Sequence, residues 1–180
     1  MKKIGNEILE ILGGRAIHPI NVTVGGFYRA PSRDALKKLL PDLEWGLAAA
    51  IETLDLVSAF EFPDLEVDYE CVSLKHSHEY PLNEGRIIST SGLDISAEQY
   101  EEHFDERHMP QSTALHSVRL PEGKPYLVGP LSRVNLCFDQ LAPAAKRAAE
   151  KCGIHWPSRN NFQSIVARAI EVIGAYEEAI

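Results

Sequence analysis

The sequence predicts an α+β fold that is mainly helical, with a small antiparallel sheet in the middle of the chain. Two observations support this prediction: apolar residues recur at helical spacing near both ends, and short extended runs broken by turn residues fill the centre. The 180 residues include 44% hydrophobic and 24% charged side chains, a composition typical of a globular protein that can bury a core. Because no repeat, low-complexity tract or long linker divides the chain, we expect a single domain over residues 1–180.

Helices are predicted for the first third of the chain. Residues 3–12 carry apolar side chains at helical spacing and end at a glycine pair, Gly13-Gly14. Ser32 is expected to cap a second helix, and Pro41 either interrupts this helix or begins the next one. The next apolar stripe runs to about Phe60 and should lie in the core or at a subunit interface; its members are Leu43, Leu47, Ala50, Ile51, Leu54 and Val57.

The middle of the chain predicts strands. Residues 67–74 and 86–89 read as the two strands of a hairpin that turns at Glu84-Gly85. Ser96 is expected to cap a short helix that carries Tyr100 and Phe104 on one side and ends at Pro110. A second hairpin is expected to pair residues 115–120 with residues 124–128. Together these strands should form one small antiparallel sheet.

The last third is again predicted to be helical. Residues 143–151 are rich in helix formers and precede Gly153, which is a suitable C-terminal stop. A final helix begins near Phe162 and runs to the end of the chain, with an apolar stripe that must meet another surface. Arg168 and Glu171 are three residues apart on it and can form an ion pair, worth about 0.2–0.5 kcal/mol if exposed. A buried structural pair is the alternative.

Charge and cysteine content exclude several classes of function. The net charge of −8 argues against a nucleic-acid partner, since phosphate binding relies on clustered Lys and Arg. Because the sequence has no long apolar run, we expect no secretory signal and no membrane span. Cys71, Cys137 and Cys152 are scattered and odd in number, which predicts no disulfide framework and suits a reducing, cytoplasmic compartment.

A short segment near the N-terminus makes unusual demands on the backbone. Pro19 should push His18 out of the α region and into an extended or turn conformation. Gly25 and Gly26 permit positive φ angles and the close approach of another backbone or a cofactor. The segment is therefore either a functional site or an ordinary glycine-rich loop that encloses a satisfied histidine.

The histidines in the middle of the chain raise a second class of hypothesis. On a strand, His76 and His78 would face the same side, and with a third ligand they could hold zinc for hydrolysis. Against this, residues 75–84 resemble a polar hairpin tip, and His103 and His108 would lie on different faces of a helix. Surface histidines that capture metal incidentally are the simpler interpretation, and we assign no metal ligand and no catalytic residue.

Four segments together resemble the large subunit of nickel–iron hydrogenases, especially the cytoplasmic branch that reduces deazaflavin or nicotinamide cofactors. The first has the pattern Gly-x-x-x-His-Pro-x5-Gly-Gly and begins at Gly14. The others follow in the order expected of that family and cover nearly the whole chain: Arg29-Ala30-Pro31, then residues 128–135 (VGPLSRVN), then residues 158–161 (SRNN) leading into residues 167–171 (ARAIE).

This resemblance implies what the chain does and what it lacks. The complete subunit interconverts dihydrogen with protons and electrons, and it holds nickel and iron through two Cys-x-x-Cys pairs. Neither pair is in these 180 residues, so we expect the central part of a large subunit, without cofactor and inactive by itself. A stand-alone binding or assembly protein that forms homo-oligomers is the alternative.

The resemblance also assigns a role to the first segment. In the intact enzyme, electrons leave through iron–sulfur clusters of a small subunit. The residues at this contact would be His18, Pro19, Gly25 and Gly26. His18 would donate a hydrogen bond near a cluster and tune its potential, and it would not bind nickel.

Overall fold

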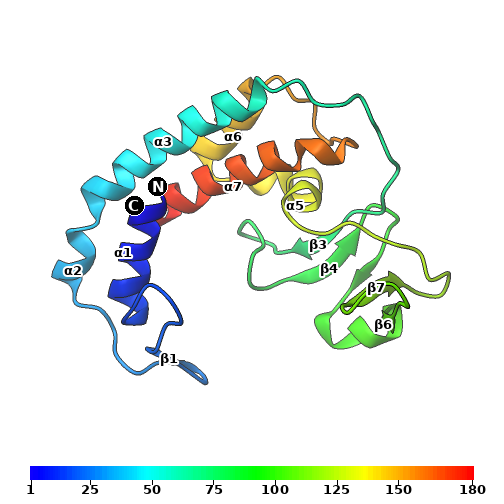
Figure 1. Cartoon of the computed structure of the whole chain (residues 1–180), viewed down its shortest axis with the longest axis horizontal. Helices are drawn as coiled ribbons and strands as arrows, with labels where there is room; N and C mark the ends of the chain where they lie inside the picture. Colours follow the sequence, from blue (N-terminus) through cyan, green and yellow to red (C-terminus); the bar gives the residue numbers. More distant parts are fainter.

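The computed structural model describes all residues, 1–180, and its helices form an arch around small strands (Figure 1). The α-helices and strands follow one another along the chain in this order: α1 (Lys2–Gly13), β1 (Val22–Thr23), β2 (Gly26–Phe27), α2 (Arg33–Lys37), α3 (Leu40–Ser58), β3 (Val72–Lys75), β4 (Arg86–Ser89), β5 (Asp94–Ile95), α4 (Tyr100–His103), β6 (Phe104–His108), β7 (Leu115–Arg119), α5 (Pro130–Cys137), α6 (Pro143–Lys151) and α7 (Ser164–Ala179). The predicted α+β class, mainly helical, is confirmed.

The main core lies where α7 packs against α3, α6 and α5. Leu54 of α3 and Ile170 and Ile173 of α7 are fully buried there. Gly46 lets α3 approach α7 closely, because a Cβ at this position would lie 2.3 Å from the ring of Tyr176. The apolar stripes predicted on both helices therefore meet each other. At the beginning of the last stripe, however, Phe162 and Ile165 remain exposed.

Local sequence signals set the helix ends. Ser32 Oγ accepts a hydrogen bond from the backbone N–H of Ala35, which confirms the predicted cap of α2. Pro41 lies in the first turn of α3, where its missing N–H needs no partner. Gly14 closes α1 with a φ of 83°, in the left-handed region that glycine adopts without strain.

The first predicted hairpin is confirmed. β3 and β4 pair antiparallel with Val72 opposite Ser89 and Lys75 opposite Arg86, and β5 extends the sheet on the other side of β4. Gly85 is required at the turn, since it has a φ of 139° and a Cβ there would lie 2.5 Å from the Lys75 carbonyl oxygen. The first strand is shorter than predicted and begins at Val72, although Cys71 forms a bridge to Leu127.

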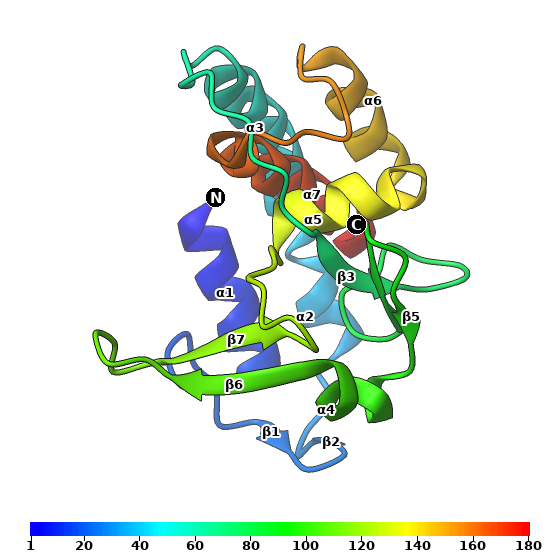
Figure 2. The same ribbon diagram turned by 90° about the vertical axis from the view of Figure 1, so that its right-hand side faces the viewer.

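The second predicted hairpin is wrong. The short helix ends at His103, not at Pro110, and residues 104–108 form β6, which pairs along its full length with β7 (Figure 2). Phe104 is buried against Tyr100 and Tyr126, and the polar residues after it pair with β7 and do not continue the helix. Residues 124–128 contribute only isolated bridges. As a result, the chain contains three small antiparallel sheets in place of the single one predicted.

None of the helices combines the length and the hydropathy that a membrane span needs.

Candidate functional site

The N-terminal arm, defined here as residues 15–31, leaves the body of the molecule after α1 and carries the small β1–β2 hairpin (Figure 1). His18 lies outside the right-handed helical region, as predicted, with a φ of 52°. Its carbonyl oxygen accepts a hydrogen bond of 2.6 Å from Arg15 Nε. The imidazole is exposed and has no hydrogen-bond partner within the chain, so it is free to meet another molecule.

Gly25 and Gly26 lie at the turn of the β1–β2 hairpin in the arm. Thr23 pairs with Gly26, and Gly25 and Gly26 have φ angles of 82° and 155°. A Cβ at either glycine would meet no atom within 4 Å. The close approach expected at these glycines is therefore not made by this chain, and it occurs instead at Gly13, where a Cβ would lie 2.7 Å from Pro19 Cβ.

Asn21 fixes the arm to the end of α1. Its Nδ2 donates to the carbonyl oxygens of Leu12 and Arg29 at 2.8 and 2.6 Å, and its Oδ1 accepts from the Arg29 N–H at 2.9 Å. Arg29 and Pro31 thereby face Gly14 across a cavity of 370 Å³. The structure thus brings together the first two family-like segments. Sequence reasoning missed Asn21, although an asparagine inside a loop is a known signal for side chain to backbone bonding.

The apolar side chains of the arm lie in solvent. Ile17 is 71% exposed, Tyr28 is 77% exposed and Val24 is fully exposed. Val22 and Phe27 are also exposed on the hairpin. Apolar side chains gathered on one projecting element are characteristic of a surface that another protein covers.

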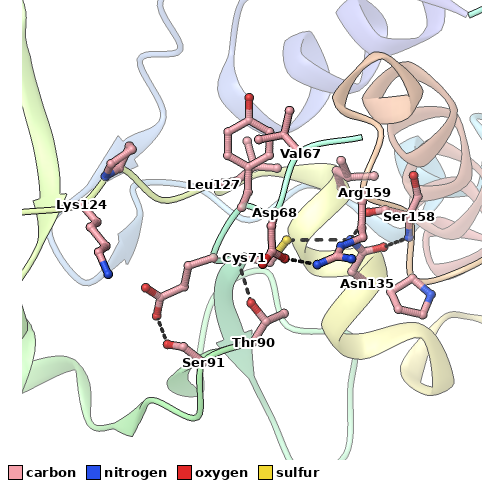
Figure 3. Close-up of a pocket in the computed structure, with 15 residues that line it drawn as sticks. Val67, Asp68, Cys71, Thr90, Ser91, Lys124, Leu127, Asn135, Ser158 and Arg159 are labelled. Atoms are coloured by element: carbon pink, nitrogen blue, oxygen red, sulfur yellow. Dashed lines mark hydrogen bonds and ion pairs between the residues drawn. The ribbon is translucent and has the colours of Figure 1, made fainter. Parts of the chain in front are cut away.

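A larger cavity lies at a different place, between the segment that precedes β3, the turn that follows β4 and helix α5 (Figure 3). Its volume is about 910 Å³. Residues 67–71 form one wall, Leu131 and Asn135 of α5 form another, and Ser158 and Arg159 close it. The third and fourth family-like segments therefore share one cavity, and sequence reasoning did not predict that they meet.

Asn135 and Ser158 join these two segments by reciprocal hydrogen bonds. Asn135 Nδ2 donates to the Ser158 carbonyl oxygen at 2.7 Å, and the Ser158 N–H donates to Asn135 Oδ1 at 2.8 Å. Ser158 Oγ donates to Gln163 Oε1 at 2.6 Å, which ties the same loop to the start of α7. Since these polar groups satisfy one another, they set the shape of the cavity wall.

Charged residues of both signs line the cavity. Arg159 forms an ion pair with Asp68, and this hydrogen bond and charge raise the pKa of the guanidinium (Figure 3). Burial acts to raise the pKa of Glu70, but hydrogen bonds with Ser91 and Ser89 and the charge of Arg119 outweigh burial and lower it. The cavity therefore contains matched charges.

The donor set of the chain does not fit a nickel–iron centre. Cys71 lies 3.8 Å from Asn135 Nδ2, Cys137 donates to the Leu74 carbonyl oxygen at 3.5 Å, and Cys152 donates to the Ala149 carbonyl oxygen at 3.1 Å. Burial raises the pKa of the Cys137 thiol, which disfavours the thiolate. No three side chains among the His, Cys, Asp and Glu residues are grouped closely enough to bind one metal ion.

The histidine pair lies on the tip of the β3–β4 hairpin and not on a strand. The rings of His76 and His78 are 5.9 Å apart, and His76 Nδ1 lies 3.9 Å from a carboxylate oxygen of Glu79. His108 is on β6, so its predicted helical placement is also corrected. The strand geometry on which the zinc hypothesis depends is therefore not formed.

Glu171 has a different partner from the one predicted. Arg133 donates to both of its carboxylate oxygens, at 2.6 and 2.8 Å, and the Tyr80 hydroxyl donates to it at 2.8 Å. Burial and the neighbouring carboxylate raise the pKa of Tyr80. Arg168 is exposed and forms no ion pair, because the carboxylate of Glu171 is held by Arg133. The observed pair joins two family-like segments, 38 residues apart.

Comparisons with known proteins identify relatives of this chain. No family model matches the chain. The alpha subunit of sulfhydrogenase 1 from Pyrococcus furiosus is 30% identical over 100% of this chain, which corresponds to 42% of that subunit. The alpha subunit of sulfhydrogenase 2 from the same organism is 29% identical over 98% of this chain and 40% of its own length.

A solved structure has the same fold. A chain in the crystal structure of an NAD+-reducing [NiFe]-hydrogenase in the H2-reduced state superimposes with a TM-score of 0.83 and 19% identity. The match covers 98% of this chain and 44% of that chain. This protein therefore spans less than half the length of the relatives it matches, and it is homologous to the alpha subunits of hydrogenases.

Proposed function

We propose that these 180 residues act as the central part of a nickel–iron hydrogenase large subunit, whose complete form interconverts dihydrogen with protons and electrons. The observation that carries the proposal is the homology to sulfhydrogenase alpha subunits over essentially the whole chain. The pairing of the four family-like segments into two cavities supports it, because the residues that suggested the family lie together in space.

The N-terminal arm is proposed to contact the hydrogenase small subunit. Its exposed apolar side chains give this contact a hydrophobic surface, and Gly25 and Gly26 leave open space beside the hairpin for the partner backbone. The exposed imidazole of His18 is placed to donate a hydrogen bond to a neighbouring molecule. Such a donor near a cluster sulfur shifts the reduction potential of an iron–sulfur cluster.

The chain by itself is proposed to be inactive and to hold no nickel–iron centre, since its cysteines lie apart. The test is metal analysis of protein purified without a histidine tag, together with hydrogen-dependent reduction of a dye. We expect neither stoichiometric nickel nor activity. Stoichiometric nickel that accompanies hydrogen uptake would contradict this proposal.

We also propose that the protein is located in the cytoplasm. The three free cysteines support this location.

The arm contact is tested by co-expression with a hydrogenase small subunit. We expect the two chains to co-purify, and Val24→Asp with Phe27→Asp to abolish the complex by placing charges in the apolar surface. Leu115→Asp, which changes an exposed leucine on the other projecting ribbon, is the matched control and should keep the complex. Retention of the complex in the arm variant would exclude the arm as the contact.

The role of His18 is tested in an intact homologous enzyme. Replacement of the equivalent histidine by alanine should slow electron transfer to the acceptor and shift a cluster potential while nickel content stays normal. Loss of nickel would contradict a tuning role. The exposed arm also favours a second candidate, a stand-alone binding or assembly protein, which predicts a stable partner complex without any hydrogenase small subunit.

A further inference from the structure

Helix α3 carries large apolar side chains on two opposite sides. On its inner side, Leu54 and Val57 belong to the main core that α3 forms with α7. Trp45 lies nine residues before Leu54, which at about 100° per residue places it on the opposite side of the helix. Trp45 is 58% exposed and Leu56 is 62% exposed, and α3 runs along the outside of the arch (Figure 1). A helix that is apolar on both sides is characteristic of one that is covered on both.

A carboxylate lies between the two exposed apolar side chains. Glu52 follows Trp45 by seven residues and precedes Leu56 by four, so all three lie within about 40° of one another on the same side of α3. Trp45 and Leu56 are three helical turns apart, a distance of about 16 Å along the helix axis. We call Trp45, Glu52 and Leu56 the outer stripe of α3.

No cation accompanies the outer stripe on its own helix. α3 contains four acidic residues and no Lys or Arg. The four are exposed, and none of them takes part in an ion pair: Asp42, Glu44, Glu52 and Asp55. Ala48 and Ala49 lie beside the stripe, and their short side chains leave room for larger ones from a second helix. The outer side of α3 is therefore apolar along its middle and negatively charged.

The position of Glu52 restricts which partner can cover the stripe. A surface that covers both Trp45 and Leu56 also removes Glu52 from water, because Glu52 lies between them. Burial of a carboxylate is strongly unfavourable unless a cation pairs with it. The α3 helix of a second copy offers only further carboxylates, so it cannot supply that cation. The partner surface must therefore be apolar with a Lys or Arg near its centre.

We propose that the outer stripe binds a basic amphipathic helix of another protein. A helix of three or more turns matches the length of the stripe, and its apolar side chains cover Trp45 and Leu56. A cation near its middle pairs with Glu52, and Arg suits this place because a guanidinium donates two parallel hydrogen bonds to a carboxylate. Further cations face Glu44 and Asp55, which lie along one flank of the stripe. The contact is separate from the N-terminal arm and does not rest on the proposed hydrogenase role.

A synthetic peptide tests the contact. The probe is about 18 residues long, enough to form a helix, with Leu along one stripe, Arg at the centre of that stripe and Lys on its flanks. A matched peptide carries Glu in place of Arg and Lys. Fluorescence anisotropy of the labelled peptides should show that one basic peptide binds per chain, more weakly as salt is added, and that the acidic peptide does not bind.

Two pairs of variants separate the stripe from the rest of the acidic surface. Glu52→Lys should weaken binding of the basic peptide by about tenfold or more, because it places like charges together. Glu150→Lys, an equal charge change at an exposed position of α6, is the control and should leave the affinity unchanged. Leu56→Ala should weaken binding by about tenfold, whereas Leu115→Ala, at an exposed leucine of β7, should not.

The fluorescence of Trp45 shows where the peptide binds. The only other tryptophan of the chain is Trp156, so Trp156→Phe leaves Trp45 as the single indole. Its emission should shift to shorter wavelength when a helix covers it. Circular dichroism checks that each variant is folded, and the affinity measurements above involve only exposed positions.

Several results would overturn the proposal. They are a wild type that does not bind the basic peptide, a Glu52→Lys variant that binds it as tightly as the wild type, and binding that leaves the emission of Trp45 unchanged. Self-association that shifts this emission without any peptide would assign the stripe to a second copy and would equally overturn it.

Discussion

The α3–α7 core and the N-terminal arm both consist of strongly apolar sequence, yet the chain buries one and exposes the other. Leu54 and Ile170 are covered by each other's helices, whereas Ile17 and Val24 lie in solvent. The core residues of the two helices cover one another, whereas the arm is tied to the end of α1 by the side-chain hydrogen bonds of Asn21 and by Pro19 and Ile20, which lie close to Gly13 and Gly14. Apolar patterning therefore identifies surfaces that need a partner, but it does not say whether the partner lies in the same chain.

The largest expected effect tests this difference directly. Leu54→Ala should lower the free energy of unfolding by about 2–5 kcal/mol, because it leaves a cavity in the core. Ile17→Ala in the arm should change it by less than about 0.5 kcal/mol, since its side chain is already in water. Urea denaturation followed by circular dichroism measures both values. A large loss in the Ile17 variant would mean that the arm packs on the body in solution.

A smaller loss is expected at the ion pair that crosses the core. Arg133→Met removes the bidentate partner of Glu171 and leaves a mostly buried carboxylate with only the Tyr80 hydroxyl. We expect a loss of about 1–3 kcal/mol in urea denaturation. Arg168→Met, on the same helix as Glu171, is the control and should have almost no effect on the free energy of unfolding. Equal losses in the two variants would favour the pair predicted from the sequence.

The arm should respond locally to loss of its anchor. Asn21→Ala removes three hydrogen bonds, each worth about 1 kcal/mol or less at an exposed site. The amide of Arg29 should therefore exchange its hydrogen faster, while the midpoint of global unfolding stays close to that of the wild type. Hydrogen exchange read by mass spectrometry separates these two quantities. Unchanged exchange at Arg29 would show that another contact holds the arm.

The smallest effect concerns the wall of the large cavity. Because the pKa of Glu70 is lowered in the folded protein, its contribution to stability is present above its ordinary value of 4.5 and disappears as pH falls through the lowered value. Glu70→Gln should remove this part of the acid dependence, so wild type and variant converge at low pH. Denaturation between pH 3 and 7, roughly the range in which carboxyl groups titrate, measures the difference. A constant difference over that range would contradict the assignment.

The parts of the fold that sequence predicted well depend on neighbouring residues. Ser32 caps its helix through a residue three positions away, and residues 143–151 form a helix with the predicted bounds. The errors occurred where distant residues decide. Residues 104–108 become a strand because β7 pairs with them, and Glu171 selects Arg133 across 38 residues instead of its neighbour.

In the candidate site, too, the local features could be predicted from the sequence, and the contacts between distant residues could not. The exclusion of His18 from the right-handed helical region and the glycine turn of the arm follow from Pro19, Gly25 and Gly26, which act locally, but the positive φ of His18 does not follow from Pro19. The large cavity did not follow, because its walls join Asn135 to Ser158 through bonds that no sequence spacing indicates. Three-dimensional pairing, and not residue type, created that site.

Helix α3 crosses helix α7 in close contact at Gly46. The ring of Tyr176 rests against the bare backbone of α3 there, and the same ring also touches the cluster of Ile4, Leu39 and Leu43 under α1. A Cβ added at Gly46 would overlap the ring of Tyr176, so either that ring or α3 would have to move. The start of α3 lies about 9 Å from that point, so a tilt of about 10° would shift α1 and the attached arm by about 1.5 Å. The close packing at Gly46 thus sets the angle of α3 and, with it, the position of α1 and the arm.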